Sequence, residues 1–157
     1  MTVITHMQRR SRLAQIIDQP GGVSVGAALA QAERNLSALK DQALEVIRTN
    51  VADLVSGPPA EAPEAVRLDS TYATAAQIID AASPFAMDDL CIAARGLCDL
   101  VDAAPREGGF DWRIPAAYAQ AMKLLLALPA DAGEARQTIV DNLNEVLRRK
   151  LGDQPGA

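Results

Sequence analysis

The sequence is poor in aromatic residues and in histidine, and it has no long hydrophobic run. It contains two phenylalanines, two tyrosines, one tryptophan and a single histidine, His6, among 157 residues. No window approaches the roughly 18 uninterrupted apolar residues that a membrane-spanning helix needs. The start of the chain also has polar and basic residues where a signal peptide needs an apolar core. These absences predict a cytoplasmic protein without a membrane span.

The net charge and the cysteine content exclude further classes of partner and site. The formal net charge of -5 argues against a nucleic-acid partner, because such proteins neutralise phosphates with clustered lysines and arginines. Cys91 and Cys98 are seven residues apart on one expected helix, about 10 Å along its axis, which is too far for a disulfide. His6 lies far from both in the sequence, so we expect reduced core cysteines, no metal site and no cofactor.

The composition predicts one all-α domain over residues 1–157. Alanine is abundant and β-branched runs are few, which favours closely packed helices. Short connections between the expected helices imply antiparallel neighbours, so we expect an up-and-down helical bundle. In this interpretation a four-helix core carries extra helices at both ends.

The first half of the chain is expected to hold an arm, a long helix and a linker. Residues 1–23 form an arm or a short helix that ends before Pro20, Gly21 and Gly22. Ser24 is expected to cap a helix that continues nearly to Ser56. Apolar residues recur along it at near-heptad spacing (Val25, Leu29, Ala32, Leu36, Leu39, Ala43, Val46 and Leu54). Such a stripe suits a bundle core or a dimer seam, and of the two we expect core packing. Residues 57–65 carry three prolines and indicate a linker between helices.

The second half predicts four further helices. One covers about residues 65–83, with Leu68, Tyr72, Ala75, Ile79 and Ala82 on its apolar stripe, and the Ser83-Pro84 pair ends it. The next has Asp88 and Asp89 in its first turn, where carboxylates favour the positive end of the helix dipole. A third covers residues 114–128. The last is expected to start with Asp131 as cap and Glu134 closing a capping box, and to bury Ile139, Leu143, Val146 or Leu147, and Leu151.

The segment AAQIIDAASPFAMDDL, residues 75–90, resembles the signature of histidine phosphotransfer domains. Aligned without a gap, Ala76 takes the place of the phospho-accepting histidine and Ile79 that of a lysine. Asp80 falls on the first glycine, and small residues follow it up to Ser83. Phe85, Ala86 and Met87 then occupy the aromatic, glycine and apolar positions.

The departures at Ala76 and Ile79 fall on the phosphotransfer chemistry of that signature. A methyl group cannot accept a phosphoryl group, and isoleucine cannot neutralise phosphate. The resemblance therefore implies a pseudo-phosphotransfer bundle that binds a response-regulator receiver domain or a histidine kinase without being an enzyme. Its partner-binding surface would comprise Ala76, Gln77, Ile79, Asp80 and Ser83. The start of the chain, MTVITHMQRRSRLAQIIDQPGG, also resembles small chemotaxis-cluster proteins of the CheE type.

Two other hypotheses remain open from the sequence. One is a ligand-holding bundle with a pocket beneath Trp112, Tyr118 and Met122, in which Trp112 could also simply anchor its loop. The other is a structural homodimer that uses the stripe of the long helix between chains. The sequence shows no catalytic constellation that would favour an enzyme over these alternatives.

Overall fold

The computed structural model describes residues 24–105 and 108–152. Within these ranges the chain forms five α-helices and one short 3-10 turn, and it forms no strand. The elements are α2 (Val25–Ser56), α3 (Glu64–Ala82), η1 (Ser83–Phe85), α4 (Asp88–Asp102), α5 (Arg113–Ala127) and α6 (Gly133–Gly152). The all-α fold class predicted from the composition is confirmed. The arm expected over residues 1–23 lies outside the described part of the chain.

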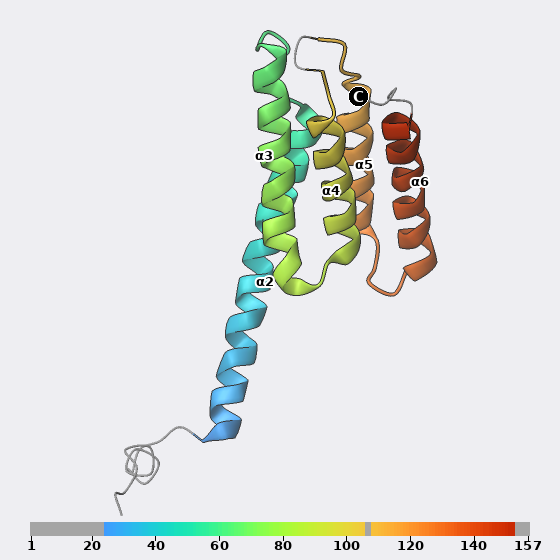
Figure 1. The fold of residues 1–157 in the computed structure, drawn as a ribbon. Helices are drawn as coiled ribbons and strands as arrows, with labels where there is room; N and C mark the ends of the chain where they lie inside the picture. Colours follow the sequence, from blue (N-terminus) through green and yellow to red (C-terminus); the bar gives the residue numbers. More distant parts are fainter. Residues whose placement is uncertain (1–23, 106–107, 153–157) are drawn as a thin grey trace, which may run out of the picture. The chain divides into compact units, whose positions relative to one another are not determined.

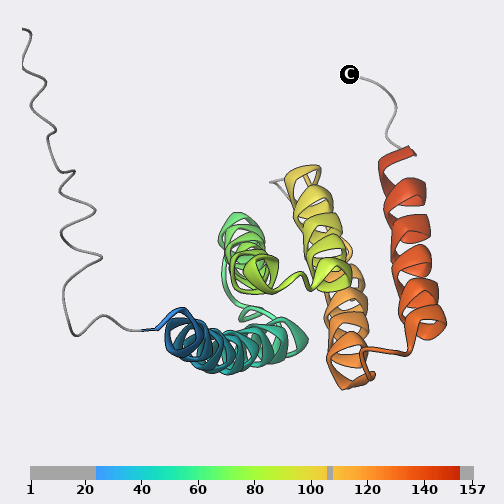
Figure 2. The same cartoon turned by 90° about the horizontal axis from the view of Figure 1, so that it is seen from below.

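Internal contacts divide the chain into two units, Met1–Ala38 and Leu39–Ala157. Of the first unit, the structure describes residues 24–38, which form the N-terminal part of α2. In the second unit successive helices run in opposite directions, as in an up-and-down bundle (Figure 1). α4 contacts α3, α5 and α6, and α6 lies on the side of α4 and α5 that is away from α3 (Figure 2). α4 is therefore the central helix of this unit.

The core of the second unit combines large aliphatic side chains with small residues on α3 and α4. The largest side chains with almost no exposed surface are Tyr118, Ile47, Leu68, Ile78, Leu90, Leu97, Met122, Leu125 and Val101. Ala75 and Ala82 of α3 and Ala93 and Ala94 of α4 are also fully or almost fully buried. Small side chains at these points let helix axes approach each other, which is the packing that the alanine-rich composition predicts.

The ends of the first helices follow their local sequence. The Ser24 side chain caps α2, because its Oγ accepts a hydrogen bond from the Ala27 backbone N–H at 3.2 Å. After α2, Gly57 takes a positive φ of 70° and donates its N–H to the Asp53 carbonyl at 2.9 Å. α3 starts at Glu64, inside the predicted linker, directly after Pro63.

The predicted start of the last helix is wrong by one residue. α6 begins at Gly133, and its first backbone bond joins the Arg136 N–H to the Ala132 carbonyl at 3.0 Å. Asp131 is therefore in the preceding turn and does not cap the helix. The alanine at the capping position gives no side-chain oxygen to the first free N–H groups.

The expected core stripe of α2 is also largely wrong. Its large members are solvent-exposed, with exposed fractions of 77% for Val25, 58% for Leu29, 58% for Leu36, 55% for Leu39 and 49% for Val46. The residues of α2 that are buried are Ile47, Asn50, Val51 and Leu54. These recur at spacings of three and four, but on a neighbouring side of the helix. Of the expected stripe, only Leu54 is buried by the residues that the structure describes.

Smaller errors of the same kind occur on α3 and α6. On α3 the structure buries Thr71 and Ile78, whereas the expected Tyr72 is exposed and Ile79 is half-buried. On α6 it buries Val140 and Leu143, while Ile139 and Leu147 are half-buried against the core and Val146 and Leu151 are exposed. Neighbouring residues on a helix point about 100° apart, so a shift by one residue rotates the whole apolar face.

Tyr118 joins α5 to α4 and α6 at the centre of the core. Its hydroxyl donates a hydrogen bond to the Leu143 carbonyl of α6 at 2.9 Å. On the α4 side, a Cβ built on Gly96 would lie 3.3 Å from two atoms of the Tyr118 side chain. The glycine therefore leaves room for the ring to pack closely on α4. Burial, together with the nearby Asp99, raises the pKa of Tyr118 to about 12.

This buried phenol makes folding stability depend on alkaline pH. The ordinary pKa of tyrosine is about 10, so between pH 10 and about 12 the unfolded chain loses a proton that the folded chain keeps. The free energy of unfolding should therefore fall by about 2–3 kcal/mol across this interval. Denaturant titrations at successive pH values, followed by circular dichroism, measure the fall.

Tyr118→Phe is the matched variant for this measurement. It should lose about 1 kcal/mol at neutral pH with its hydrogen bond, and it should lack the part of the alkaline fall that the phenol contributes between pH 10 and about 12. A separate fall of similar size, between pH 9 and about 11, should persist in both proteins, because burial and the neighbouring Asp99 raise the pKa of Cys98 from 9.0 to about 11. Equal pH profiles for the two proteins above pH 10 would contradict this assignment.

Candidate functional site

The residues of the predicted partner-binding surface lie on one side of α3. Gln77, Asp80 and Ser83 are exposed, while Ala76 and Ile79 are half-buried, and Ile79 packs partly against the core. At about 100° per residue, Ala76, Asp80 and Ser83 fall within one narrow sector of the helix. The buried residues Ala75, Ile78 and Ala82 occupy a sector roughly opposite. Asp80 of α3 and Ser83, the first residue of η1, thus share a solvent-facing side with Ala76, and Gln77 lies at its edge, about 60° from Asp80 around the helix axis.

The turn that follows this surface contains a left-handed residue. Ala86 has φ 52° and ψ 42°, and it is the only non-glycine residue with positive φ in the described part of the chain. Its N–H donates to the Ser83 carbonyl at 3.2 Å, and the next N–H, of Met87, donates to the Ala82 carbonyl at 3.4 Å. Glycine adopts this conformation without the steric cost that a Cβ imposes. Ala86 is the residue that the sequence-based alignment sets against a glycine of the phosphotransfer signature, and that resemblance stays a prediction.

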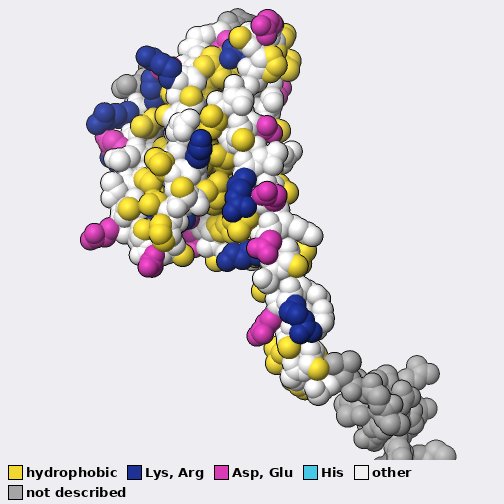
Figure 3. All heavy atoms as spheres, turned by 180° about the vertical axis from the view of Figure 1, so that it is seen from behind, with side chains coloured by type: hydrophobic (Ala, Val, Ile, Leu, Met, Phe, Trp, Pro, Cys, Tyr) yellow, Lys and Arg dark blue, Asp and Glu magenta, His cyan; other side chains and the backbone are white. Residues whose placement is uncertain are grey.

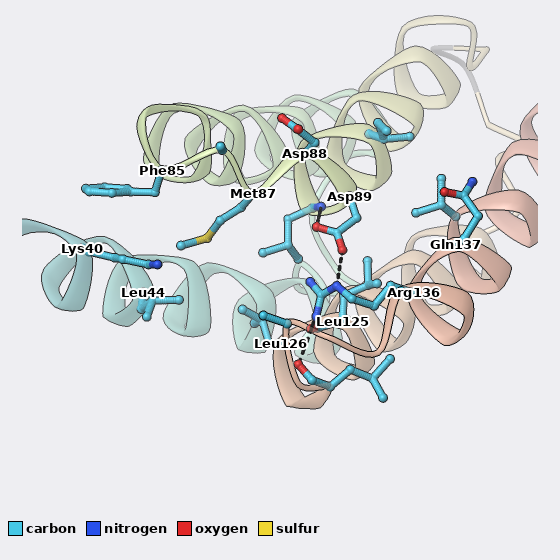
Figure 4. Close-up of a pocket in the computed structure, with 17 residues that line it drawn as sticks. Lys40, Leu44, Phe85, Met87, Asp88, Asp89, Leu125, Leu126, Arg136 and Gln137 are labelled. Atoms are coloured by element: carbon cyan, nitrogen blue, oxygen red, sulfur yellow. Dashed lines mark hydrogen bonds and ion pairs between the residues drawn. The ribbon is translucent and has the colours of Figure 1, made fainter. Parts of the chain in front are cut away.

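A groove of about 670 Å³ opens beside the same turn. Its walls come from α2, the η1 turn, the start of α4, the end of α5 and the start of α6 (Figure 4). The turn contributes Phe85 and Met87, and α2 contributes Lys40 and Leu44. The lining therefore mixes apolar side chains with charges of both signs. Sequence reasoning did not find this groove, because its walls are far apart in the chain.

Arg136 fixes the floor of the groove. Its Nε donates to Oδ2 of Asp89, and the same carboxylate accepts the Leu90 backbone N–H through Oδ1 at 3.1 Å. One guanidinium nitrogen also donates to the carbonyls of Leu125 and Leu128, at 2.9 and 3.0 Å. These two carbonyls lie in the last turn of α5 and just after it, where backbone acceptors lack helical partners. One side chain thus ties the starts of α4 and α6 to the end of α5 (Figure 4).

The position of Arg136 in the sequence could have indicated that its side chain has a specific partner. The residue lies within the first turn of α6, where a cation is unfavourable because the helix dipole is positive there. A basic residue at such a place indicates a specific anionic partner. Here Asp89 and the carbonyl end of α5 provide it.

Trp112 anchors the loop between α4 and α5. The Arg67 guanidinium of α3 lies 3.8 Å from the centre of the indole ring. Phe110 meets the same ring edge to face at 5.1 Å, and the Phe110 N–H donates to the Glu64 carboxylate at 3.0 Å. These contacts fit the simpler interpretation of Trp112 as a loop anchor.

The other two residues of the alternative ligand pocket are in the core. Tyr118 is 1% exposed and Met122 is completely buried. Their surroundings are the packed helices α4, α5 and α6, whereas the groove of about 670 Å³ lies beside the η1 turn. A ligand pocket beneath Trp112, Tyr118 and Met122 stays a prediction without support from these positions.

The described residues offer few reactive groups. Cys91 is half-buried and Cys98 is buried, and both are free thiols. Burial raises the pKa of both, so neither is a thiolate at neutral pH. Among residues 24–105 and 108–152 no group of three or more His, Cys, Asp or Glu side chains is arranged to hold a metal ion. In the same ranges no helix has the length and apolar character to cross a membrane.

Charged side chains are mixed on the face seen in Figure 3. Lysine and arginine side chains are scattered there among acidic and hydrophobic ones, and they do not gather into one basic patch. Salt bridges on α2 and α6 join neighbouring turns, as between Arg48 and Glu45 at 3.2 Å and between Arg149 and Glu145 at 2.8 Å. Such exposed pairs add little to stability.

Comparison of the chain with protein-family models, with curated proteins and with solved structures found no match. A functional interpretation therefore depends on the geometry of the α3 surface, the η1 turn and the groove beside it.

Proposed function

We propose that this protein is a non-catalytic recognition module that binds a response-regulator receiver domain or a histidine kinase. The binding surface is the exposed side of α3 together with Ser83 at its C-terminal end: Ala76, Asp80 and Ser83 form its middle, and Gln77 and Ile79 lie at its edges. In this proposal the protein competes with or organises true phosphocarriers of a two-component or chemotaxis pathway.

The observation that carries the proposal is the combination of this surface with the turn that follows it. Polar side chains are exposed on the helix that, in the phosphotransfer signature, carries the phospho-accepting histidine. The backbone of Ala86 is in the left-handed conformation, and the signature has glycine at this position. At the histidine position the chain has Ala76, whose methyl group accepts no phosphoryl group. A surface of this shape without a phosphate acceptor acts through recognition.

Calorimetric titration of the full chain against a panel of receiver domains and histidine kinases tests the proposal. The double variant Gln77→Arg/Asp80→Lys changes the size and charge of two exposed side chains of the surface, so it should weaken binding at least tenfold. Both positions are exposed, so the fold should be unaffected.

Asp53→Lys is the matched control. It reverses an exposed acidic side chain on α2, outside the proposed surface, and it should bind as the unmodified chain does. Absence of binding across the whole panel refutes the proposal. Stable, acid-labile labelling of the chain by a phosphorylated receiver domain also refutes it, because a non-catalytic module takes no phosphoryl group.

A further inference from the structure

α2 presents an apolar stripe that the described residues, 24–105 and 108–152, leave largely exposed. Every residue from 24 to 39 except Ala30 is exposed, and the exposed set includes Leu29, Leu36 and Leu39, each more than half exposed. A helical segment of this length is only marginally stable in water without packing against another surface. Exposed leucines along one side of the helix favour burial of that side against a partner. The stripe thus has the character of a helix face that is buried in an assembly.

The spacing of the stripe indicates a coiled coil. From Leu29 the apolar positions alternate strictly by three and four residues, through Ala32, Leu36, Leu39 and Ala43 to Val46. This period of 3.5 residues keeps a seam on one side of a supercoiled helix. α2 is continuous over the whole repeat. The surface that fits such a seam is a second helix with the same repeat.

The order of side-chain sizes in the stripe is symmetric about a point between Leu36 and Leu39. When a second α2 is placed antiparallel about this point, Leu36 meets the partner's Leu39. The next layers join Ala32 to the partner's Ala43, and Leu29 to the partner's Val46. Each layer therefore pairs large with large or small with small, so the seam fits a second copy of itself.

Charged residues beside the seam favour the antiparallel orientation. Glu33 and Lys40 each follow a seam residue directly, so both flank the same edge of the stripe. In the antiparallel pair, Glu33 faces the partner's Lys40, and Lys40 faces the partner's Glu33. In a parallel pair the heptad would place Glu33 opposite the partner's Ala28, and Lys40 opposite the partner's Asn35. Opposite charges thus meet only in the antiparallel arrangement.

We propose that α2 pairs with α2 of a second copy of this chain in an antiparallel coiled coil centred between Leu36 and Leu39. The pairing uses the stripe from Leu29 to Val46 and leaves the α3 surface outside the seam. It is independent of the proposed receiver or kinase binding, because it rests on other residues.

Sedimentation equilibrium of the full chain over a concentration series tests this pairing. The unmodified protein should approach twice the monomer mass. Leu36→Glu/Leu39→Glu places four carboxylates in the centre of the seam and should give a monomer at every concentration. Ser37→Glu/Ala38→Glu adds the same charge next to the seam residues but away from the stripe, and it should remain a dimer. Circular dichroism should show that both variants are folded, since all four positions are exposed.

A charge-reversal cycle tests the orientation. Glu33→Lys alone and Lys40→Glu alone should each raise the dissociation constant of the dimer roughly tenfold, because each creates two repulsive pairs. The double variant should restore it. A monomeric unmodified chain, a dimer that survives Leu36→Glu/Leu39→Glu, or single reversals without effect would each overturn the proposed antiparallel pairing.

Discussion

Leu97→Ala is expected to lower the free energy of unfolding by about 3–4 kcal/mol. Leu97 is completely buried on α4, and α4 contacts α3, α5 and α6. Removing the isobutyl group loses its transfer energy and leaves a cavity, because neighbours held by three helices relax only in part. Urea unfolding followed by circular dichroism gives the difference.

The matched control for this substitution is Leu124→Ala on α5. The chemical change is identical, but Leu124 is 57% exposed. Its replacement should change the free energy of unfolding by no more than about 0.5 kcal/mol, since alanine is also the better helix former. Similar losses for the two variants would show that α4 is not the centre of the core.

Arg136→Met is expected to lower the free energy of unfolding by about 3 kcal/mol. The ion pair is mostly buried, with exposed fractions of 19% for the Arg136 side chain and 21% for Asp89. The variant keeps most of the side-chain volume but leaves the Asp89 carboxylate without its counter-charge. It also removes the donor to the carbonyls of Leu125 and Leu128. Denaturant unfolding measures the loss.

Two controls distinguish the effect of the Arg136–Asp89 ion pair from that of an ordinary exposed salt bridge. Arg148→Met breaks an exposed pair with Glu145 and should cost less than about 1 kcal/mol. The double variant Asp89→Asn/Arg136→Met should cost less than the sum of the two single variants, because the two side chains act on each other. Strict additivity of the single losses would refute a coupled pair at the groove floor.

The fold class and the helices could be predicted from local sequence. Alanine content, prolines and glycines between helices, and the serine before α2 act within a few residues of the chain, so they do not depend on tertiary structure. The faces of the helices were harder to predict. On α3 and α6 the apolar pattern was broad enough to allow two neighbouring stripes, and packing selected Ile78 and Val140 over Ile79 and Ile139.

α2 shows why a periodic pattern alone does not assign a core. Its sequence contains a near-heptad apolar stripe, but the residues that the fold buries, such as Ile47 and Val51, lie on an adjacent side of the helix. A stripe that suits a bundle core also suits a seam between chains, and only the burial of each residue separates the two. The exposed leucines of α2 are therefore the main finding that sequence reasoning could not supply.

The partner-binding site stays a prediction, although the structure gives the exposure of its residues. Of the residues to which the phosphotransfer-like signature pointed, Gln77, Asp80 and Ser83 are exposed, and Ala76 and Ile79 are half-buried. The left-handed Ala86 and the groove beside it could not be derived, because an alanine gives no local signal for positive φ and the groove needs five separate segments. The unfavourable place of Arg136 at the positive end of a helix dipole indicated that it has an anionic partner. The sequence could not identify that partner, because Asp89 is 47 residues away in the chain.

The central claim is that the exposed side of α3 binds a signalling partner without accepting a phosphoryl group. An amide-resolved NMR titration of the full chain with a receiver domain or kinase that binds it tests this most directly. The proposal predicts that the largest shifts fall on Gln77, Asp80 and Ser83 and on the turn up to Met87. Shifts confined to other helices, with these amides unchanged, would contradict it.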